Sequence, residues 1–255
     1  MRLVDGADAI RGDLPTASTT VVDVPLEAGD SRGSGVSRLG SIEIVRDRTL
    51  AALAELPDRV VTIGGDCGVE LGSIGHVLAR TGGDVAVVWF DAHPDLNTPE
   101  SSPSAAFCGM VLRTLTGDGE ASLLPSVPLA AGNVILAGTR STDDDEAEYV
   151  ASSGVARLGV DELSPEALVA AIEKTGASSV YLHVDLDVLD PSEIAGLADP
   201  MPFGVEATAL VALIRAVTAR FPIAGAGITS YSPASEADAT DDLPTILRLV
   251  GALSS

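Results

Sequence analysis

The segment DVAVVWFDAHPD (residues 84–95) joins a continuous apolar run to two aspartates and a histidine. The run from Asp84 to Phe90 is typical of a strand that is buried on both faces of a sheet. A second segment, SVYLHVDLD (residues 179–187), repeats this plan later in the chain. Ligands bind at the carboxyl ends of the strands in open parallel sheets. The two segments therefore predict an acidic site at one edge of a sheet.

Strand-like and helix-like segments alternate along the chain, with short connections between most of them. The predicted strands are 19–24, 59–63, 84–90, 133–138, 155–158, 179–185 and 223–228. The predicted helices are 42–56, ended by Pro57, then 69–80, 110–115, 143–151, 165–174, 204–220 and 243–253. This alternation predicts an α/β fold with a mostly parallel sheet and helices on both of its faces. Without an internal repeat or a clear linker, residues 1–255 are expected to form a single domain.

Composition excludes several classes of partner. The net charge of −22 argues against binding to nucleic acid or to an anionic membrane. The first residues carry no apolar signal core, and no apolar window of about 18 residues is present, so we expect a cytoplasmic protein. Cys67 and Cys108 are too few for a disulfide framework in 255 residues.

Acidic and histidine side chains follow the ends of the predicted strands. The segments expected to converge on one crevice are 64–67, 91–97, 138–143, 185–191 and 229–236. Carboxylates with one imidazole suit a hard or borderline divalent ion such as Mn²⁺. Two shared aspartates would hold two ions about 3.5–4 Å apart, and the water between them would act as a nucleophile. The alternative for each isolated cluster is a solvated turn.

Three motifs carry a resemblance to a known family. The segments GGDC (64–67), DAHPDLNTP (91–99) and DLDVLDP (185–191) resemble the signatures of the arginase/agmatinase (ureohydrolase) family. The resemblance spans roughly residues 60–235. It implies a three-layer α/β/α fold, a pair of Mn²⁺ ions and hydrolysis of guanidino or formimino groups. The metal ligands that it implies are Asp91 and Asp185, shared by both ions, His93 and Asp187 at one ion, and Asp95 and Cys67 at the other.

The substrate side resembles arginases more closely than agmatinases. Asn97 and Ser104 fall where arginases contact the α-carboxylate of the amino acid. Asp143 ends the segment GTRSTD (138–143), which resembles the strand end that meets the α-ammonium group. The simpler alternatives are an Asx turn at Asn97 and an ordinary loop position at Ser104. A small-molecule substrate is therefore expected, and the family tendency suggests a homo-oligomer, as a trimer or hexamer.

Three positions depart from the family pattern, and all lie where the chemistry is expected. Cys67 replaces the histidine of Gly-Gly-Asp-His, and either ligates as a thiolate, which favours Zn²⁺, or is a small buried thiol. Cys108 replaces the histidine taken as the proton donor to the leaving amine, and is either a donor or an inert helix-start residue. Ser230 replaces the glutamate that pairs with the guanidinium. His183 is either a group below the metals or a hydrogen-bonded core histidine.

Two functions follow from this pattern. The first is a metal-dependent hydrolase of linear C–N bonds in an arginine-like substrate, with Asp95, Cys108 and Ser230 at its catalytic positions. Urea and an amino acid would be the products. The second is a catalytically impaired member that acts as a binding protein or an oligomeric partner. The replacements at Cys108 and Ser230 favour the second, whereas the retained carboxylates favour the first, because buried charges are costly without a cation.

Overall fold

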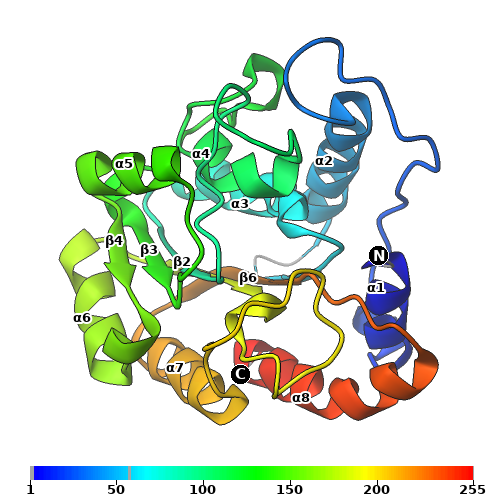
Figure 1. Cartoon of the computed structure of the whole chain (residues 1–255), viewed down its shortest axis with the longest axis vertical. Coiled ribbons are helices and arrows are strands. Elements are labelled where there is room, and N and C mark those ends of the chain that lie inside the picture. Colours follow the sequence, from blue (N-terminus) through cyan, green and yellow to red (C-terminus); the bar gives the residue numbers. More distant parts are fainter. Residues whose placement is uncertain (1–2, 57–58, 255) are drawn as a thin grey trace.

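A six-stranded sheet forms the centre of the computed structural model, which describes residues 3–56 and 59–254. The strand order is β1-β6-β5-β2-β3-β4, and every neighbouring pair is parallel (Figure 1). The strands are β1 (Val61–Ile63), β2 (Ala86–Phe90), β3 (Val134–Ala137), β4 (Ala156–Leu158), β5 (Val180–Asp185) and β6 (Ile223–Thr229). The predicted parallel sheet is therefore confirmed.

Helices cover both faces of this sheet. They are α1 (Leu3–Gly12), α2 (Leu39–Ala54), α3 (Glu70–Thr81), α4 (Val111–Leu115), α5 (Asp144–Ser153), α6 (Pro165–Thr175), α7 (Ala207–Arg220) and α8 (Glu236–Ser254). In Figure 1, α2, α3 and α4 lie above the sheet, and α1, α6, α7 and α8 lie below it. Each layer buries its own apolar cluster against the strands. The architecture is the expected three-layer α/β/α arrangement.

The register of β2, β5 and β6 brings their carboxyl ends together. Every residue of β2 and β5 is buried, which explains why both segments are apolar without alternation. Trp89 of β2 pairs with His183 of β5, and Asp185 pairs with Thr229 at the end of β6. Asp91 follows β2 directly, so it emerges beside Asp185 at the same edge of the sheet.

The predicted strand 19–24 is wrong. These residues form neither a helix nor a strand, and Val21 and Val24 are 56% and 61% exposed. β-branched residues favour a strand only where a neighbouring strand and a buried face are available. The sequence predicts neither of those partners, and the structure provides none for this segment.

Two helices at the ends of the chain were not predicted in full. Helix α1 was missed; it packs closely on Tyr231, since a Cβ added at Gly6 would lie 2.1 Å from the Tyr231 carbonyl oxygen. Helix α8 begins at Glu236 instead of 243 and includes Pro244. Asp242 in its first half accepts hydrogen bonds from the backbone N–H groups of Ala195 and Gly196. Both helices depend on contacts between distant segments. The predicted stop at Pro57 lies outside the described residues.

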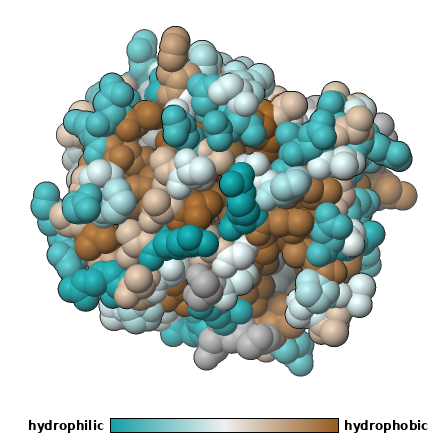
Figure 2. Space-filling model, turned by 90° about the horizontal axis from the view of Figure 1, so that it is seen from below, coloured by the Kyte–Doolittle hydropathy of each residue, from teal (hydrophilic) through white to brown (hydrophobic). Residues whose placement is uncertain are grey.

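The described residues contain no helix that is both long and apolar enough to cross a membrane. On the face seen in Figure 2, hydrophobic and hydrophilic residues are interspersed. Scattered apolar residues of this kind are usual on protein surfaces.

We expect Leu182→Ala in β5 to lower the free energy of unfolding by roughly 2–5 kcal/mol. Leu182 is fully buried, so the shortened side chain leaves a cavity between β5 and the lower helix layer. Leu26→Ala is the matched control, because Leu26 is fully exposed, and it should change the free energy by less than about 0.5 kcal/mol. Urea denaturation measures both values. Equal effects of the two substitutions would contradict the packing described here.

Candidate metal centre

All five segments predicted to converge do meet at the carboxyl edge of the sheet. The N–H of Ala92 donates to Asp187 Oδ1 at 3.0 Å, which joins 91–97 to 185–191. The N–H of Ser230 donates to the Gly65 carbonyl at 2.6 Å, which joins 229–236 to 64–67. The N–H of Arg140 donates to the Ala92 carbonyl at 2.9 Å. The predicted convergence of these segments is therefore confirmed.

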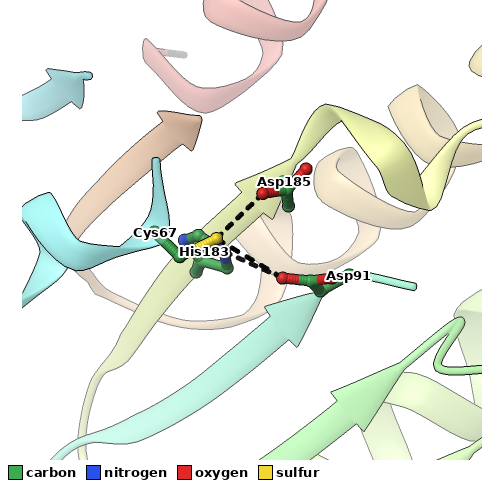
Figure 3. A group of neighbouring side chains, drawn as sticks. All are labelled: Cys67, Asp91, His183 and Asp185. Atoms are coloured by element: carbon green, nitrogen blue, oxygen red, sulfur yellow. Dashed lines mark hydrogen bonds and ion pairs between the residues drawn. The ribbon is translucent and has the colours of Figure 1, made fainter. Parts of the chain in front are cut away.

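One group of potential ligands surrounds Cys67. It consists of Cys67, Asp91, His183 and Asp185, whose ligand atoms all lie within 4.8 Å of one another (Figure 3). The Cys67 Sγ atom lies 2.8 Å from Asp185 Oδ2 and 3.6 Å from Asp91 Oδ2. The His183 Nε2 atom lies 3.6 Å from Asp91 Oδ2. All four side chains are buried.

A second group shares Asp91 with the first and consists of Asp91, His93 and Asp187. The His93 Nδ1 atom lies 2.9 Å from Asp187 Oδ2 and 3.5 Å from Asp91 Oδ1. His93 is partly exposed, whereas both aspartates are buried, so the second group lies nearer to solvent. A shared carboxylate between two such groups is the arrangement that holds a pair of ions close together.

Asp95 was predicted as a ligand but belongs to neither of these groups. It is buried, and its Oδ2 atom has no hydrogen-bond partner. Its backbone φ of 53° lies in the left-handed region, which is uncommon for residues other than glycine. The backbone is fixed there because the Asp95 carbonyl accepts hydrogen bonds from the N–H groups of Leu112 and Arg113. Its role as a ligand remains a prediction.

Without a cation the cluster carries more negative charge than its surroundings can balance. Burial, followed by the repulsion of Asp91, raises the pKa of Asp95 well above its usual value. Burial and repulsion raise the pKa of both Asp185 and Asp187 to about 6. Burial lowers the pKa of His93, but hydrogen bonds to Asp187 and Asp91 outweigh it and raise the pKa to about 11. Carboxylates and imidazoles with an unpaired buried oxygen suit divalent cations, so the residues present fit a metal site.

The Ser230 hydroxyl is already hydrogen-bonded within the site. Its hydroxyl donates to Asp185 Oδ2, the same atom that accepts from Cys67 and, at 3.2 Å, from Thr229. The φ of Ser230 is 66°, again in the left-handed region. Two of the three departures from the family pattern, Cys67 and Ser230, therefore act on one carboxylate oxygen.

Cys108 belongs to neither group of ligands. It is half-buried in the 3₁₀ turn Phe107–Met110 and packs against the apolar cluster above the sheet. Burial, followed by the Asp66 and Asp95 carboxylates, raises the pKa of the Cys108 thiol to about 12. At neutral pH the side chain is a protonated thiol, which holds a proton but releases it with difficulty.

The predicted substrate residues are only partly brought together. Asn97 is buried, and its Nδ2 donates to Asp143 Oδ2 at 2.9 Å while its Oδ1 accepts from Ser101. The N–H of Asp143 donates to Glu146 at the start of α5. Ser104 is exposed in a turn, where its hydroxyl accepts from the N–H of Ala106. Asn97 and Asp143 thus form a pair, whereas Ser104 makes no hydrogen bond with either of them.

Sequence reasoning named His183 but missed Glu70 and Tyr181, which support it from below the site. Glu70 is fully buried at the start of α3; its Oε1 lies 2.9 Å from His183 Nδ1, and its Oε2 accepts from the Tyr181 hydroxyl at 2.5 Å. Burial lowers the pKa of His183, but the carboxylates of Asp91 and Glu70 raise it to about 9. The only available signal for Glu70 was a charged residue at the start of a largely apolar helix.

Arg140 was also missed, although it lies in the quoted segment 138–143. Its guanidinium donates to the carbonyls of Asp187 and Met201 at 2.7 and 2.8 Å, and to that of Val188 at 3.3 Å. The cation therefore fixes the backbone next to Asp187 without joining either group of ligands. Its consequence is structural: the loop after β5 cannot move away from the end of β3 without breaking several hydrogen bonds.

Comparison with known proteins identifies the family. The model of the Arginase family matches residues 11–248. The arginase of Entamoeba histolytica is 28% identical over 243 residues, covering 90% of this chain and 80% of that protein. The arginase of Bacillus caldovelox is 30% identical over 209 residues, covering 76% of this chain and 67% of that protein.

The fold agrees with this assignment. The crystal structure of the E. histolytica arginase in complex with L-ornithine superposes with a TM-score of 0.83 at 24% identity, covering 92% of this chain and 84% of that one. With a parallel sheet, acidic strand ends and the family match together, the class is that of the ureohydrolases. The chain belongs to the arginase family.

We expect Gly227→Ala in β6 to lower the free energy of unfolding by roughly 1–3 kcal/mol. A Cβ at this position would lie 1.7 Å from Glu70 Oε1, so the buried carboxylate would be forced out of its contact with His183. Gly251→Ala in α8 is the control, since no atom lies within 4 Å of the added Cβ, and it should raise stability by about 0.5–1 kcal/mol. Thermal unfolding of both variants tests this. A fully stable Gly227→Ala protein would refute the tight fit.

We expect chelated protein to lose stability as the pH rises from about 4 to 7. The pKa of Asp185 and of Asp187 is about 6 in the folded chain, compared with 3.8 for an unperturbed aspartate, as in the unfolded chain. The folded state therefore binds more protons than the unfolded state over this pH range. Stability therefore falls with rising pH. Mn²⁺ at a hundred times its dissociation constant should restore about 2.7 kcal/mol at pH 7. Scanning calorimetry should show a smaller pH effect and a smaller Mn²⁺ response in Asp187→Asn. An Asp187→Asn profile that matches the wild type in both would contradict this electrostatic account.

Proposed function

We propose that this protein is a metal-dependent hydrolase that cleaves a linear C–N bond in an amidine or guanidino group, with arginine-like compounds as the first substrates to test. The observation that carries the proposal is the burial of Asp91, Asp185 and Asp187 beside His93 in a chain of the arginase family. Buried carboxylates that repel one another are unfavourable structural material unless a cation is bound.

The residues that would hold the cations are Asp91 and Asp185, shared by both ions, with His93 and Asp187 at one of them. Asp95 and Cys67 are proposed at the other. A pair of divalent cations at this place would lower the pKa of a shared water and stabilise negative charge that develops on the substrate. The chain itself fixes the donor atoms, since Asp91, Asp185 and Asp187 each accept a backbone N–H.

Proton transfer is proposed for two side chains. Asp95 has a buried and unpartnered Oδ2, which can accept the proton of an attacking water. Cys108 is a protonated thiol, which can pass its proton to the leaving amine. Its high pKa makes that transfer less favourable than transfer from an imidazole, so we expect slow turnover with substrates whose leaving amine needs full protonation.

Recognition of an amino-acid substrate is proposed for Asn97, Ser104 and Asp143. The E. histolytica relative was crystallised with L-ornithine, which supports an amino-acid-like ligand. Ser230 argues against a strongly cationic group on the substrate, because Ser230 is uncharged and its hydroxyl already donates a hydrogen bond to Asp185. A guanidinium would forgo a charge-assisted hydrogen bond worth roughly 1.5–3 kcal/mol at that position. A neutral or weakly basic amidine fits these residues better than the guanidinium itself.

A catalytically impaired protein that binds ligands or partners is the second candidate. Its support is specific: Cys108 lies in apolar packing, and Ser230 is hydrogen-bonded to a predicted metal ligand. This candidate and the hydrolase differ in one measurable property, the release of product by metal-loaded protein.

A product-release assay tests the proposal directly. Protein loaded with Mn²⁺ or Zn²⁺ is incubated with arginine, agmatine, guanidinobutyrate or formiminoglutamate, and urea, ammonia and formamide are measured. We expect turnover of at least one compound, and loss of that turnover in Asp187→Asn. Metal-loaded protein that is inactive with the whole panel would favour the binding function.

We expect the double variant Cys108→His with Ser230→Glu to hydrolyse arginine faster than the wild type. The histidine would supply a better proton donor, and the glutamate would pair with the guanidinium. Turnover of arginine is compared in the wild type, in each single variant and in the double variant. Loss of the Ser230 hydrogen bond to Asp185 is controlled by Ser230→Gln, which is uncharged. If the double variant gains nothing over Ser230→Gln, the roles given to these positions are wrong.

A further inference from the structure

The Nε2 atom of His183 has no hydrogen-bond partner and faces the group of ligands around Cys67. The residue lies in β5, two positions before Asp185, and its side chain is completely buried. Its Nε2 atom has no hydrogen-bond partner, and the distance of 3.6 Å to Asp91 Oδ2 is longer than a hydrogen bond. Figure 3 shows the ring next to Cys67, with both Asp91 and Asp185 facing this pair. A buried polar atom without a partner needs an explanation.

The other ring nitrogen of His183, Nδ1, is hydrogen-bonded to Glu70. His183 Nδ1 lies 2.9 Å from Glu70 Oε1, and the Tyr181 hydroxyl fixes the other oxygen of Glu70. An ionised carboxylate only accepts hydrogen bonds, so Nδ1 carries the proton. In the neutral ring the lone pair is then on Nε2 and faces Cys67, Asp91 and Asp185. Trp89 stacks on the ring at 3.6 Å between centroids, which fixes its plane.

A carboxylate behind one ring nitrogen, with the other nitrogen free, is the usual environment of a metal-ligating histidine. The ring of His183 meets both conditions, and a thiol and two carboxylates surround its free nitrogen. The alternative is an imidazolium that itself supplies positive charge beside Asp91. Charge-assisted N–H···O contacts are about 2.7–2.9 Å long, so the observed 3.6 Å favours the ligand over the cation.

We propose that His183 is a metal ligand and that Glu70 is its positioning residue. The ion next to Cys67 is then held by Cys67, Asp91, His183 and Asp185, so the imidazole that the family places at position 67 is supplied from strand β5 instead. His183 takes the ligand position given above to Asp95, and Asp95 keeps only its proposed role as a proton acceptor. Binding displaces the thiol proton of Cys67, and any proton on His183 Nε2, to solvent. This inference rests on the proposed function, because it concerns the same pair of ions.

The donor set also specifies the metal. One thiolate, one imidazole and two carboxylates suit Zn²⁺ or Co²⁺ in four-coordinate geometry better than Mn²⁺. The second group, Asp91, His93 and Asp187, has only oxygen and nitrogen donors and remains suited to Mn²⁺. The two positions should therefore differ in preference, with the softer ion next to Cys67.

The experiment uses Co²⁺ as the probe with full-length protein. We expect two ions per chain and a near-ultraviolet thiolate-to-cobalt absorption band. His183→Gln should bind one ion fewer and lose most of the band, and Cys67→Ser should abolish it. Cys108→Ser is the matched control and should retain the band, because Cys108 belongs to neither group of ligands. His93→Gln should also bind one ion fewer but keep the band.

Glu70→Gln tests the positioning role. It retains a hydrogen-bonding side chain but loses the charge behind the ring, so Co²⁺ affinity at the band-producing position should fall tenfold to a hundredfold. Affinity at the position near His93 should stay the same. An unchanged affinity at both positions would overturn the role of Glu70.

Several outcomes would overturn the ligand role of His183. If His183→Gln binds two ions and its absorption band is undiminished, His183 is not a ligand. That result would not contradict the proposed hydrolase function. One ion in the wild type, at His93 only, would indicate an imidazolium in place of the metal. No ion in the wild type would defeat both this inference and the proposed function.

X-ray absorption of the unmodified Zn²⁺ protein keeps the test independent of variant folding. Spectra should show sulfur at about 2.3 Å and two imidazoles for each pair of ions. A single imidazole for the pair would overturn the inference even if His183→Gln does not fold.

Discussion

The mutual repulsion of the buried carboxylates of Asp91, Asp185 and Asp187 is the constraint that the surrounding structure has to meet. Parallel strands β2 and β5 deliver these groups to one edge, where little water reaches them. Each carboxylate accepts one backbone N–H, which lowers the repulsion only in part. Burial lowers the pKa of His93, but hydrogen bonds to Asp187 and Asp91 raise that pKa to about 11, so the imidazolium balances part of the charge. Divalent cations would balance the remainder.

Two of the three positions that depart from the family pattern, Cys67 and Ser230, are connected through one atom. Cys67 and Ser230 both donate to Asp185 Oδ2, although they lie 163 residues apart in the chain and on different loops. If Cys67 ligates a cation as proposed, its thiol would release a proton and would no longer donate to Asp185. Ser230 would remain a donor to the same carboxylate and would stabilise its negative charge. The replacements at 67 and 230 therefore meet at Asp185, whereas Cys108 belongs to neither group of ligands.

The sequence predicts the parallel sheet and the acidic edge because local patterns carry them. The segments 84–90 and 179–185 are recognisable as buried strands, and carboxylates at their ends converge by the geometry of parallel sheets alone. The contact between Glu70 and His183 could not be predicted from such local patterns. Each is a charged or titratable residue in an apolar segment, and their contact spans 113 residues of sequence. The false strand at 19–24 failed for the opposite reason, since its composition favours a strand but no partner strand is there.

Anomalous X-ray diffraction from crystals grown with Zn²⁺ and Mn²⁺ tests the central claim most directly, because it locates each metal without depending on activity. The account predicts two anomalous peaks beyond the ends of β2 and β5, both within bonding distance of Asp91, with one of them also bonded to His93 and Asp187. Crystals that contain both metals at high concentration but show no peak near Asp91 would contradict it.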